Sequence, residues 1–330
     1  MKTLITGGAG FLGDRLARAL LASGEVTVAG ETSPLTGVTV VDRVPPRPDL
    51  AGDDRVTAVV GDLGEALAAG VLEGIDLVFH LAAVVSSEAE RDFDLGMRVN
   101  LAATMDLLEA CRAQATPPRL VFTSSLAVFG STDALPLPPV ITDETLPTPQ
   151  SSYGIQKFIG EQLVADYARR GLVPARTVRL MTVAVRPGAP NAAASSFLSG
   201  IVREPLAGVA SNSPVPPETL VALSSPGRTV DGLLLAAAAT DAGWGPHTAL
   251  TLPALTVSVG EMVAALERVA GPDAAALVGW EPDEAVARIV TSWPSRFDSD
   301  RARRHGLTPD PDIDTNVAAY HAENGTRTTA

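Results

Sequence analysis

Tyr153 and Lys157 are the two residues of this sequence whose types and spacing best suit catalysis. They stand four positions apart in residues 152–170, where the apolar pattern predicts a helix, so both side chains emerge from one face of it. A phenol has an unperturbed pKa of about 10, and a nearby ammonium favours its ionised form. We therefore expect Lys157 to lower the pKa of Tyr153, so that the phenol works as an acid/base group near neutral pH. The same spacing also arises where an aromatic residue packs on a helix beside a solvated lysine.

Ser125 is the candidate for holding the reacting oxygen of a substrate. It lies just after an apolar run, residues 120–123, that predicts a buried strand, and Ser124 precedes it. Ligands of open α/β sheets bind outside the carboxyl ends of the strands, which is where Ser125 would lie. Its hydroxyl can hydrogen-bond a reacting oxygen and orient it towards Tyr153, whereas a structural role suffices for Ser124.

A glycine-rich loop between the first predicted strand, residues 3–6, and the first predicted helix, residues 11–23, is typical of a dinucleotide site. It reads Thr-Gly-Gly-Ala-Gly-Phe-Leu-Gly over positions 6–13. Glycine there permits a tight turn, close approach of backbone to a pyrophosphate, and packing of helix against strand. Lys157 would then also hydrogen-bond the nicotinamide ribose. The predicted cofactor contacts of this segment are Gly7, Gly10, Phe11, Leu12 and Gly13.

Asp42 is the predicted anchor of the adenosine ribose. It follows the second predicted strand, residues 38–41, where a carboxylate binds ribose hydroxyls and repels a 2′-phosphate. It lies further from the glycines than the usual span of about twenty residues, because residues 30–37 look inserted before the strand. Arg43 keeps NADP open, and we predict NAD. Further predicted cofactor contacts are Asp62, Leu63, Leu81, Ala82, Ala83 and Asn100.

Polar residues in this group also have purely structural interpretations. Asp62 follows the third predicted strand, where a solvated loop aspartate is also expected. Asn100 lies inside a predicted helix, where its side chain would meet backbone or a water near Lys157, or would bend the helix locally. His80 ends the fourth predicted strand, and we assign it no chemical role.

The elements that must position these residues alternate between short apolar runs and helical patterns, the βαβ signature of a parallel sheet covered on both faces. We therefore predict an α/β fold, a doubly wound (Rossmann) parallel sheet with a small, discontinuous C-terminal substrate-binding lobe. The predicted strands are 3–6, 38–41, 56–60, 77–80, 120–123, 176–185 and 250–252. The predicted helices are 11–23, 95–113, 152–170, 229–240 and 258–269.

Two domains are expected along the chain. Residues 1–180 form an NAD-binding domain, with later strand and helix returns around 229–256, and residues 181–330 form mainly the substrate-binding lobe. Proline and glycine break residues 187–226 into short pieces, as in loops that build a site. The proline-rich residues 135–150 are short enough to be an active-site flap instead of a linker.

The amino-acid composition of the chain limits the molecules that it is expected to bind. The chain has 330 residues, 46% of them hydrophobic, and a net charge of -13 at pH 7, which disfavours nucleic acid and anionic membrane. Its single cysteine, Cys111, has no intramolecular disulfide partner, and no Cys/His cluster has metal-ligand spacing, so we expect no metal. Without a leader pattern or an apolar run of transmembrane length, we expect a soluble, cytoplasmic protein.

Taken together, these segments resemble the extended short-chain dehydrogenases, or NAD-dependent epimerase/dehydratase family, which include UDP-galactose 4-epimerase. The resemblance covers essentially the whole chain. Residues 185–197, 203–206 and 293–298, followed by Arg301 and Ala302, are similar to the D-erythronate dehydrogenase branch. The resemblance implies oxidation of the C2 hydroxyl of a four-carbon sugar acid to a 2-keto acid, with NAD⁺ as acceptor. It also implies a homodimer, paired through two of the predicted helices, 95–113 and 152–170.

A small sugar acid needs a positive group for its carboxylate and short polar groups for its hydroxyls. Arg186 is the predicted carboxylate partner, because its planar donors suit bidentate pairing. The residues predicted to read the hydroxyls are Asn191, Ser195 and Ser196. Capping and turn formation in a proline- and glycine-rich loop also explain these serines. Arg203 and Arg228 are weaker candidates, equally explained as surface charge.

Three other functions stay open on the same residues. A ketone reductase would use Ser125, Tyr153 and Lys157 in the reverse direction. A nucleotide-sugar 4-epimerase would hold NAD tightly, show no net redox change and need a groove sized for a UDP-sugar. Residues 186–197 do not resemble the diphosphate-contacting stretch of such enzymes. A non-catalytic NAD(H)-sensing protein would have no reason to keep a tuned acid/base pair.

Overall fold

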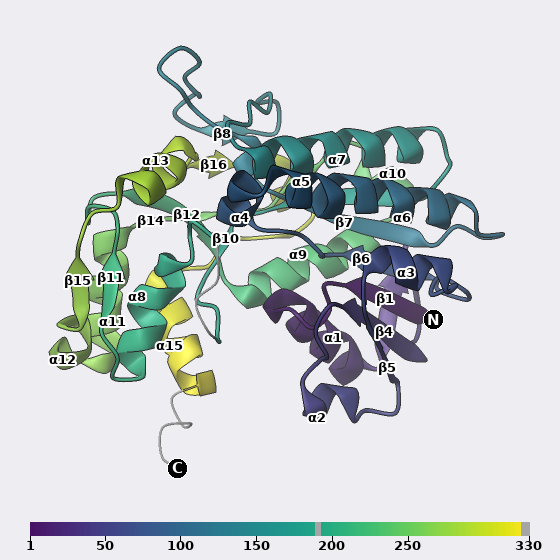
Figure 1. Ribbon diagram of the computed structural model, residues 1–330, viewed down its shortest axis with the longest axis horizontal. Coiled ribbons are helices and arrows are strands. Elements are labelled where there is room, and N and C mark those ends of the chain that lie inside the picture. The colour runs from purple at the N-terminus through teal and green to yellow at the C-terminus, as the bar shows by residue number, and fades with distance from the viewer. Residues whose placement is uncertain (189–192, 325–330) are drawn as a thin grey trace.

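A seven-stranded parallel sheet forms the centre of the computed structural model, which describes residues 1–188 and 193–324 (Figure 1). Its strands, in spatial order, are β13 (Leu250–Thr251), β9 (Ala175–Leu180), β7 (Arg119–Ser125), β6 (Leu77–His80), β1 (Lys2–Thr6), β4 (Gly37–Asp42) and β5 (Val56–Val60). Every neighbouring pair runs parallel. The chain winds outwards from β1 in both directions, so the predicted doubly wound α/β class is confirmed.

Two layers of helices cover this sheet, because alternate residues of each buried strand point to opposite faces. Ile5 packs on one face with α1 (Phe11–Ser23) and α9 (Pro226–Ala238). Its neighbour Leu4 packs on the other face. The helices of that second layer are α3 (Leu63–Ala68), α6 (Ala103–Arg112) and α7 (Ser152–Arg169). Figure 1 shows α6 and α7 running side by side over the sheet.

An antiparallel hairpin precedes β4, where the sequence shows an apparent insertion. Its strands β2 (Glu25–Val28) and β3 (Glu31–Pro34) meet at Ala29 and Gly30, whose φ values of +52° and +86° suit a two-residue hairpin turn. The amides of both turn residues donate to carbonyl oxygens at the end of α9. The hairpin therefore adds residues between α1 and β4 without changing the order of strands in the sheet. This insertion explains the long interval in sequence between the glycine loop and Asp42.

The helix predicted at residues 95–113 consists of three consecutive segments. α5 (Phe93–Gly96) and α6 flank a π-helical turn, η1 (Met97–Ala102). Asn100 lies fully buried in this turn, where its Oδ1 accepts from the Val84 amide at 2.8 Å and its Nδ2 donates to the Val84 carbonyl at 3.0 Å. Asn100 therefore fastens η1 to the loop that follows β6.

A second apolar core lies in the C-terminal lobe, on the left of Figure 1. Its sheets comprise β10 (Thr182–Val183), β12 (Leu220–Ser224) and β14 (Leu255–Ser258), and separately β11 (Ser211–Ser213) and β15 (Val278–Trp280). Its helices are α8 (Phe197–Leu206), α11 (Val259–Ala270), α12 (Pro272–Ala275), α13 (Glu284–Ser292) and α15 (Ile313–Asn324). The single strand predicted at 176–185 is therefore two, because β9 joins the central sheet and β10 joins the lobe.

The chain crosses between the two cores more than once, so the lobe is discontinuous as predicted. After β12, α9 returns to the central sheet and β13 pairs with β9, whereas β14 pairs with β12 in the lobe. β8 (Ile141–Thr142), inside the proline-rich segment, pairs with β16 (Phe297–Asp298). The remaining short helices are α2 (Pro48–Ala51), α4 (Ser86–Arg91), the 3₁₀ turn η2 (Leu126–Val128), α10 (Asp241–Trp244) and α14 (Asp300–Arg304). Among the described residues, no helix combines the length and apolarity needed to cross a membrane.

Two helices end or begin at residues that commonly cap helices. α1 spans the predicted residues, and Gly24 follows it with a φ of +69°, in the left-handed region that favours glycine. Ser258 caps α11, because its Oγ accepts from the Glu261 amide at 3.1 Å. The Glu261 carboxylate pairs with Arg268 and not with the cap, so Ser258 and Glu261 form only half of a capping box.

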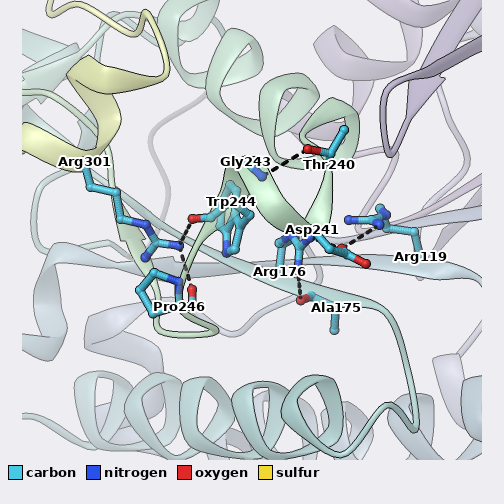
Figure 2. Close-up of polar contacts among 9 residues, drawn as sticks. All are labelled: Arg119, Ala175, Arg176, Thr240, Asp241, Gly243, Trp244, Pro246 and Arg301. Atoms are coloured by element: carbon cyan, nitrogen blue, oxygen red, sulfur yellow. Dashed lines mark hydrogen bonds and ion pairs between the residues drawn. The ribbon is translucent and has the colours of Figure 1, made fainter.

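A cluster of buried arginines ties α10 to the amino ends of β7 and β9 (Figure 2). Arg119 and Arg176 both donate to the Asp241 carboxylate, Arg119 at 3.1 Å. The Trp244 ring lies between Arg176 and Arg301, whose guanidinium carbons stand 5.2 and 4.8 Å from its centroid. Arg301 also donates to carbonyl oxygens in and just after α10. This cluster lies at the amino ends of β7 and β9, opposite the strand ends that carry Ser125.

Candidate active site

A cavity of about 290 Å³ opens at the carboxyl ends of the central strands. Its walls come from the glycine loop, the ends of β7 and β9, the start of α7, and the lobe. The predicted residues that line it are Gly7, Gly10, Phe11, Leu12, Gly13, Leu81, Ala83, Ser125, Tyr153, Lys157, Arg186 and Ser195. No residue of the proline-rich segment 135–150 lines the cavity. Within that segment β8 pairs with β16, and an active-site flap there stays a prediction.

The glycine loop has the close packing that a dinucleotide site requires. Gly7 has a φ of +68°, and a Cβ on it would lie 2.8 Å from the Ala82 amide nitrogen. A Cβ on Gly13 would lie 2.4 Å from the Gly7 carbonyl oxygen. Side chains are therefore excluded where the backbone turns into α1, leaving a bare helix N-terminus of the kind that binds pyrophosphate. These residues fit an NAD cofactor.

Asp42 lies beside this loop, at the end of β4. Its Oδ2 accepts from the Ala9 amide at 3.1 Å, and its Oδ1 accepts from the Val44 amide at 3.3 Å. The carboxylate is only partly buried. It therefore stands where a ribose could reach it, although it is not among the residues that line the main cavity.

Besides Asp42, four of the predicted cofactor contacts do not line the cavity. Asp62 caps α3, with its Oδ1 accepting from the Gly64 amide at 2.8 Å, which is the structural alternative considered for it. Leu63 is buried in the apolar cluster under α3. Ala82 lies behind Gly7, with its amide donating to Thr6 Oγ1 at 3.3 Å. These positions are set by tertiary packing, which the spacing of the sequence does not reveal.

Asn100 is the fourth of these residues, and all its bonds are internal. Besides Val84, its Nδ2 donates to Gln156 Oε1 at 2.8 Å. Gln156 is itself buried and precedes Lys157 on α7. The structure thus replaces the predicted cofactor contact with a support: Asn100 holds the loop after β6 and the α7 segment that carries the lysine.

Ser125, Tyr153 and Lys157 meet in the cavity from two elements. Ser125 ends β7, its Oγ accepting from the Ala127 amide at 3.2 Å, and its side chain hydrogen-bonds Tyr153. Tyr153 and Lys157 lie on α7, whose first turn packs closely on η2, because a Cβ on Gly154 would lie 2.1 Å from the Ala127 carbonyl oxygen. The serine and the phenol are therefore held against each other by two rigid elements.

The protonation states differ from the sequence-based prediction. Burial raises the pKa of Tyr153 to about 12, and its hydrogen bond with Ser125 opposes this only in part. Burial lowers the pKa of Lys157 to about 7, although the charge of Glu161 opposes the shift. The Lys157 Nζ lies over ring faces, 4.8 Å from the Phe122 centroid and 5.9 Å from the Tyr153 centroid. The expected lowering of the Tyr153 pKa is therefore not found in this state, because desolvation outweighs the Ser125 hydrogen bond.

His80 and Ser124 have structural roles. His80 is buried between Thr6 Oγ1, 2.6 Å from its Nδ1, and Thr104 Oγ1, 3.0 Å from its Nε2. Burial lowers the pKa of His80 to about 3, so its ring is neutral, and we assign it no chemistry. Ser124 borders the cavity, but its Oγ donates to buried Glu161 at 2.5 Å.

Arg186 and Ser195 bring the lobe to the cavity. The Arg186 amide donates to Ser199 Oγ at 3.0 Å, and burial, together with the charge of Arg203, lowers the pKa of its guanidinium. Ser196 does not line the cavity and lies at the start of α8. Asn191 lies outside the described residues.

Arg203 was a weaker candidate for binding the substrate, with surface charge as the alternative explanation, and its burial excludes surface charge. It is 8% exposed, and its Nη1 donates to the Arg186 carbonyl oxygen at 3.0 Å. Arg203 therefore supports the backbone of the residue that faces the cavity. Arg228 is exposed, 3.9 Å from Asp231, as expected of a surface charge.

Some cavity residues were missed. Met181, Thr182 and Val183 follow β9, and their place after a buried strand was a usable signal, because the carboxyl ends of parallel strands meet at one edge. Trp293 also lines the cavity, as the residue that follows α13 in the lobe. In the sequence, residues 293–298 stand out only by their family resemblance, because the local spacing of residues does not indicate that the lobe packs against the sheet.

A glycine cradle, a serine at a strand end and a tyrosine and lysine on one helix face define a dinucleotide-dependent oxidoreductase site. Residues 3–217 match the model of the NAD dependent epimerase/dehydratase family. The chain belongs to this family, as the resemblance predicted, and is an oxidoreductase that uses NAD.

Two relatives of known name and one solved structure are similar to this chain over nearly its full length. A D-erythronate dehydrogenase from Cupriavidus necator is 48% identical over 98% of this chain and 99% of its own length. A D-erythronate dehydrogenase from Haemophilus influenzae is 40% identical over 97% and 98%. A solved structure described as a nucleoside-diphosphate-sugar epimerase from Agrobacterium tumefaciens is 39% identical, with a TM-score of 0.88 over 100% of this chain and 95% of its own.

Proposed function

We propose that the protein oxidises the C2 hydroxyl of a small sugar acid, D-erythronate or a close analogue, to the 2-keto acid. The observation that carries the proposal is the meeting of Ser125, Tyr153 and Arg186 on the wall of one cavity. A proton acceptor, an oxygen-orienting hydroxyl and a carboxylate partner thereby face a common volume. The two D-erythronate dehydrogenases similar over nearly the full chain support this substrate class.

The protein's residues manage the proton and the orientation. Ser125 holds the reacting oxygen against Tyr153, and Tyr153 acts as the general base that takes the hydroxyl proton. Lys157 holds the cofactor ribose, and a charged ammonium there stabilises the phenolate. Bound NAD⁺ supplies the hydride acceptor. Because burial raises the pKa of Tyr153 to about 12, ligand binding must favour its ionised form.

The cofactor contacts remain part of the proposal. Gly7, Gly10, Phe11, Leu12 and Gly13 would hold the pyrophosphate, and Leu81 and Ala83 would lie along the cofactor. Asp42 would hold the adenosine ribose, which favours NAD over NADP. The chain from residue 181 onwards, apart from its returns to the central sheet, would serve as the substrate-binding lobe.

Substrate recognition would depend on the lobe. Arg186 would bind the carboxylate, since guanidinium donors suit a planar acid. Ser195, which lines the cavity, would contact a hydroxyl. The size of the cavity, about 290 Å³, lies at the low end of ligand sites, which span roughly 300–1,000 Å³.

Turnover of Tyr153→Phe tests the general base. NADH formation is followed by absorbance across four- to six-carbon aldonates, with NAD⁺ and with NADP⁺. We expect the variant to bind NADH as the parent does and to lose about 100-fold or more in kcat, the usual scale of general base catalysis. Normal turnover by the variant would show that another group takes the proton. A parent that oxidises no aldonate would refute the substrate class.

Arg186→Ala tests the carboxylate partner. We expect it to raise KM for the acid far more than KM for the matching neutral polyol, because only the acid carries the charge. Arg228→Ala, at an exposed arginine of the same lobe, is the matched control and should leave both KM values unchanged. Equal effects of Arg186→Ala on both substrates would remove Arg186 from the carboxylate role.

A nucleotide-sugar 4-epimerase is the second candidate, favoured by the name of the solved relative from Agrobacterium tumefaciens. It predicts epimerised UDP-sugar without accumulation of NADH, which product chromatography would detect. The reverse reaction, reduction of a 2-keto acid, uses the same residues and is measured by NADH consumption.

A homodimer is a further proposal. Apolar side chains of α5, α6 and α7 are exposed on the layer that these helices form, and comprise Phe93, Met105, Ile155 and Ile159. An exposed apolar patch of this kind favours association. Light scattering at several concentrations tests it, and we expect Ile159→Glu to yield monomers. A monomeric parent would refute it.

A further inference from the structure

α7 carries a third ionisable residue in register with the two already described. Tyr153, Lys157 and Glu161 follow at four-residue intervals, so their side chains share one face of the helix. Glu161 is 2% exposed and is not among the residues that line the cavity. A buried carboxylate is costly unless it is paired and hydrogen-bonded, so its partners indicate its role.

Two side chains hold the Glu161 carboxylate in one orientation. Arg179 binds it through both oxygens, Nε donating to Oε1 at 2.8 Å and Nη2 donating to Oε2 at 2.7 Å. Ser124 Oγ donates to Oε1 at 2.5 Å. These donors come from β9 and β7, so the carboxylate links the ends of both strands to α7.

Lys157 lies in surroundings that disfavour its charge. It is 1% exposed, and the ionisable groups that interact with it are His80 on β6, and Tyr153 and Glu161 on α7. His80 and Tyr153 are neutral at pH 7, because burial lowers the pKa of His80 to about 3 and raises that of Tyr153 to about 12. Glu161 is therefore the anionic group of this set.

We propose that Glu161 is a positioning residue whose fixed carboxylate serves as the counter-charge for the Lys157 ammonium. The inference rests on the proposed function, because the charge of Lys157 affects turnover only if Tyr153 exchanges a proton. Without the carboxylate, nothing would oppose the burial that disfavours the ammonium. Lys157 would then be neutral at the pH where Tyr153 must ionise.

Lysine NMR tests the proposal directly, because Lys2 and Lys157 are the only lysines in the sequence. In a Lys2→Arg parent, protein labelled with ¹³C at lysine Cε has one such resonance, and its pH titration reports the charge of Lys157. We expect Glu161→Gln to lower the titration midpoint by about one pH unit or more, the usual effect of losing a neighbouring opposite charge. An unchanged midpoint overturns the proposal.

A double variant separates charge from folding. Glu161→Gln leaves Arg179 buried without its partner, which by itself destabilises the fold. Glu161→Gln combined with Arg179→Gln removes both buried charges, so it should recover stability lost by the single variant. We expect its Lys157 midpoint to stay low, and the alkaline limb of its kcat profile to move to lower pH by the same interval. A midpoint that returns to the parent value would overturn the counter-charge role, because Lys157 would then need Glu161 only while Arg179 is present.

The titration requires no substrate, so it is independent of the proposed function. A lowered midpoint in a protein that oxidises no sugar acid would support the counter-charge and refute the proposed function. An unshifted midpoint in a protein that oxidises sugar acids would overturn the role of Glu161 and leave the proposed function standing.

Discussion

Asp241 is expected to stabilise the fold far more than its exposure suggests. Its side chain is 74% exposed, yet it accepts hydrogen bonds from Arg119 and Arg176, which are 5% and 2% exposed (Figure 2). Nη1 of Arg119 and Nε of Arg176 are buried and have no hydrogen-bond partner among the described residues. The two guanidiniums therefore have no obvious substitute for this carboxylate. Asp241→Asn, which keeps the shape and removes the charge, tests the pairing.

The size of the effect follows from the bonds lost. A hydrogen bond to a charged group contributes about 1.5–3 kcal/mol, and breaking a fully buried ion pair costs about 3–5 kcal/mol. Because Asp241 itself is solvated, and because asparagine still offers one acceptor, we discount these values to roughly 2 kcal/mol. The loss concerns the free energy of unfolding and should leave NADH affinity unchanged, since this cluster lies at the edge of the sheet opposite the cavity.

Urea unfolding followed by circular dichroism measures the effect. Asp231→Asn is the matched control, because its pair with Arg228 is 3.9 Å long and exposed on both sides, so we expect a change below about 0.5 kcal/mol. Burial would raise the pKa of Asp241, but the bonds from Arg176 and Arg119 outweigh it and lower the pKa. The stabilisation should therefore be present above the unfolded-state pKa and disappear as pH falls through the lower, folded-state pKa. If Asp241→Asn matches the control at pH 7, the buried arginines do not depend on this carboxylate.

Three further outcomes are expected. Gly13→Ala places a Cβ 2.4 Å from the Gly7 carbonyl oxygen and should weaken NADH binding about 10-fold or more, as measured by fluorescence titration. Gly227→Ala is the control and should leave NADH affinity unchanged, because its Cβ would make no close contact. Equal NADH affinities of the two variants would contradict the role of the glycine loop as a cofactor cradle. His80 has a folded pKa of about 3 against 6.5 unfolded, so the unfolded state binds the extra proton and stability falls as pH drops below 6.5. The parent should lose about 1 kcal/mol more than His80→Gln between pH 7 and 5.5, and identical pH dependence would mean that the ring is protonated in the fold. Trp293 lines both the main cavity and a small apolar pocket. Trp293→Ala should therefore raise the ratio of kcat/KM for six-carbon acids to kcat/KM for four-carbon acids by about 10-fold. An unchanged ratio would mean that Trp293 does not select substrates by size.

Most of the framework was predictable from the sequence. The glycine loop, the four-residue spacing of Tyr153 and Lys157, and Ser125 after an apolar run are local patterns, and local patterns determine which face of an element a residue occupies. The doubly wound sheet followed from the alternation of such segments. The hairpin before β4 was missed because its turn, Ala29-Gly30, lacks the common Asn-Gly or Asp-Gly signal.

Residues whose roles depend on partners distant in sequence were predicted less well. Asn100 bonds Val84 and Gln156 instead of facing the cavity, and Arg203 supports the Arg186 carbonyl instead of solvating the surface. Trp293 reaches the site from the lobe. Neither residue type nor spacing encodes these contacts, because they arise only when separate elements pack together.

The sequence by itself therefore determined which groups meet: a cofactor cradle, a serine and a tyrosine–lysine pair on a parallel sheet. Tertiary structure decided the chemical state of those groups. Burial raises the pKa of Tyr153 and lowers that of Lys157, and Glu161, held by Arg179, opposes the second shift. The reason is physical: spacing along a helix is a local property, whereas the cost of a charge depends on every element that excludes water from it.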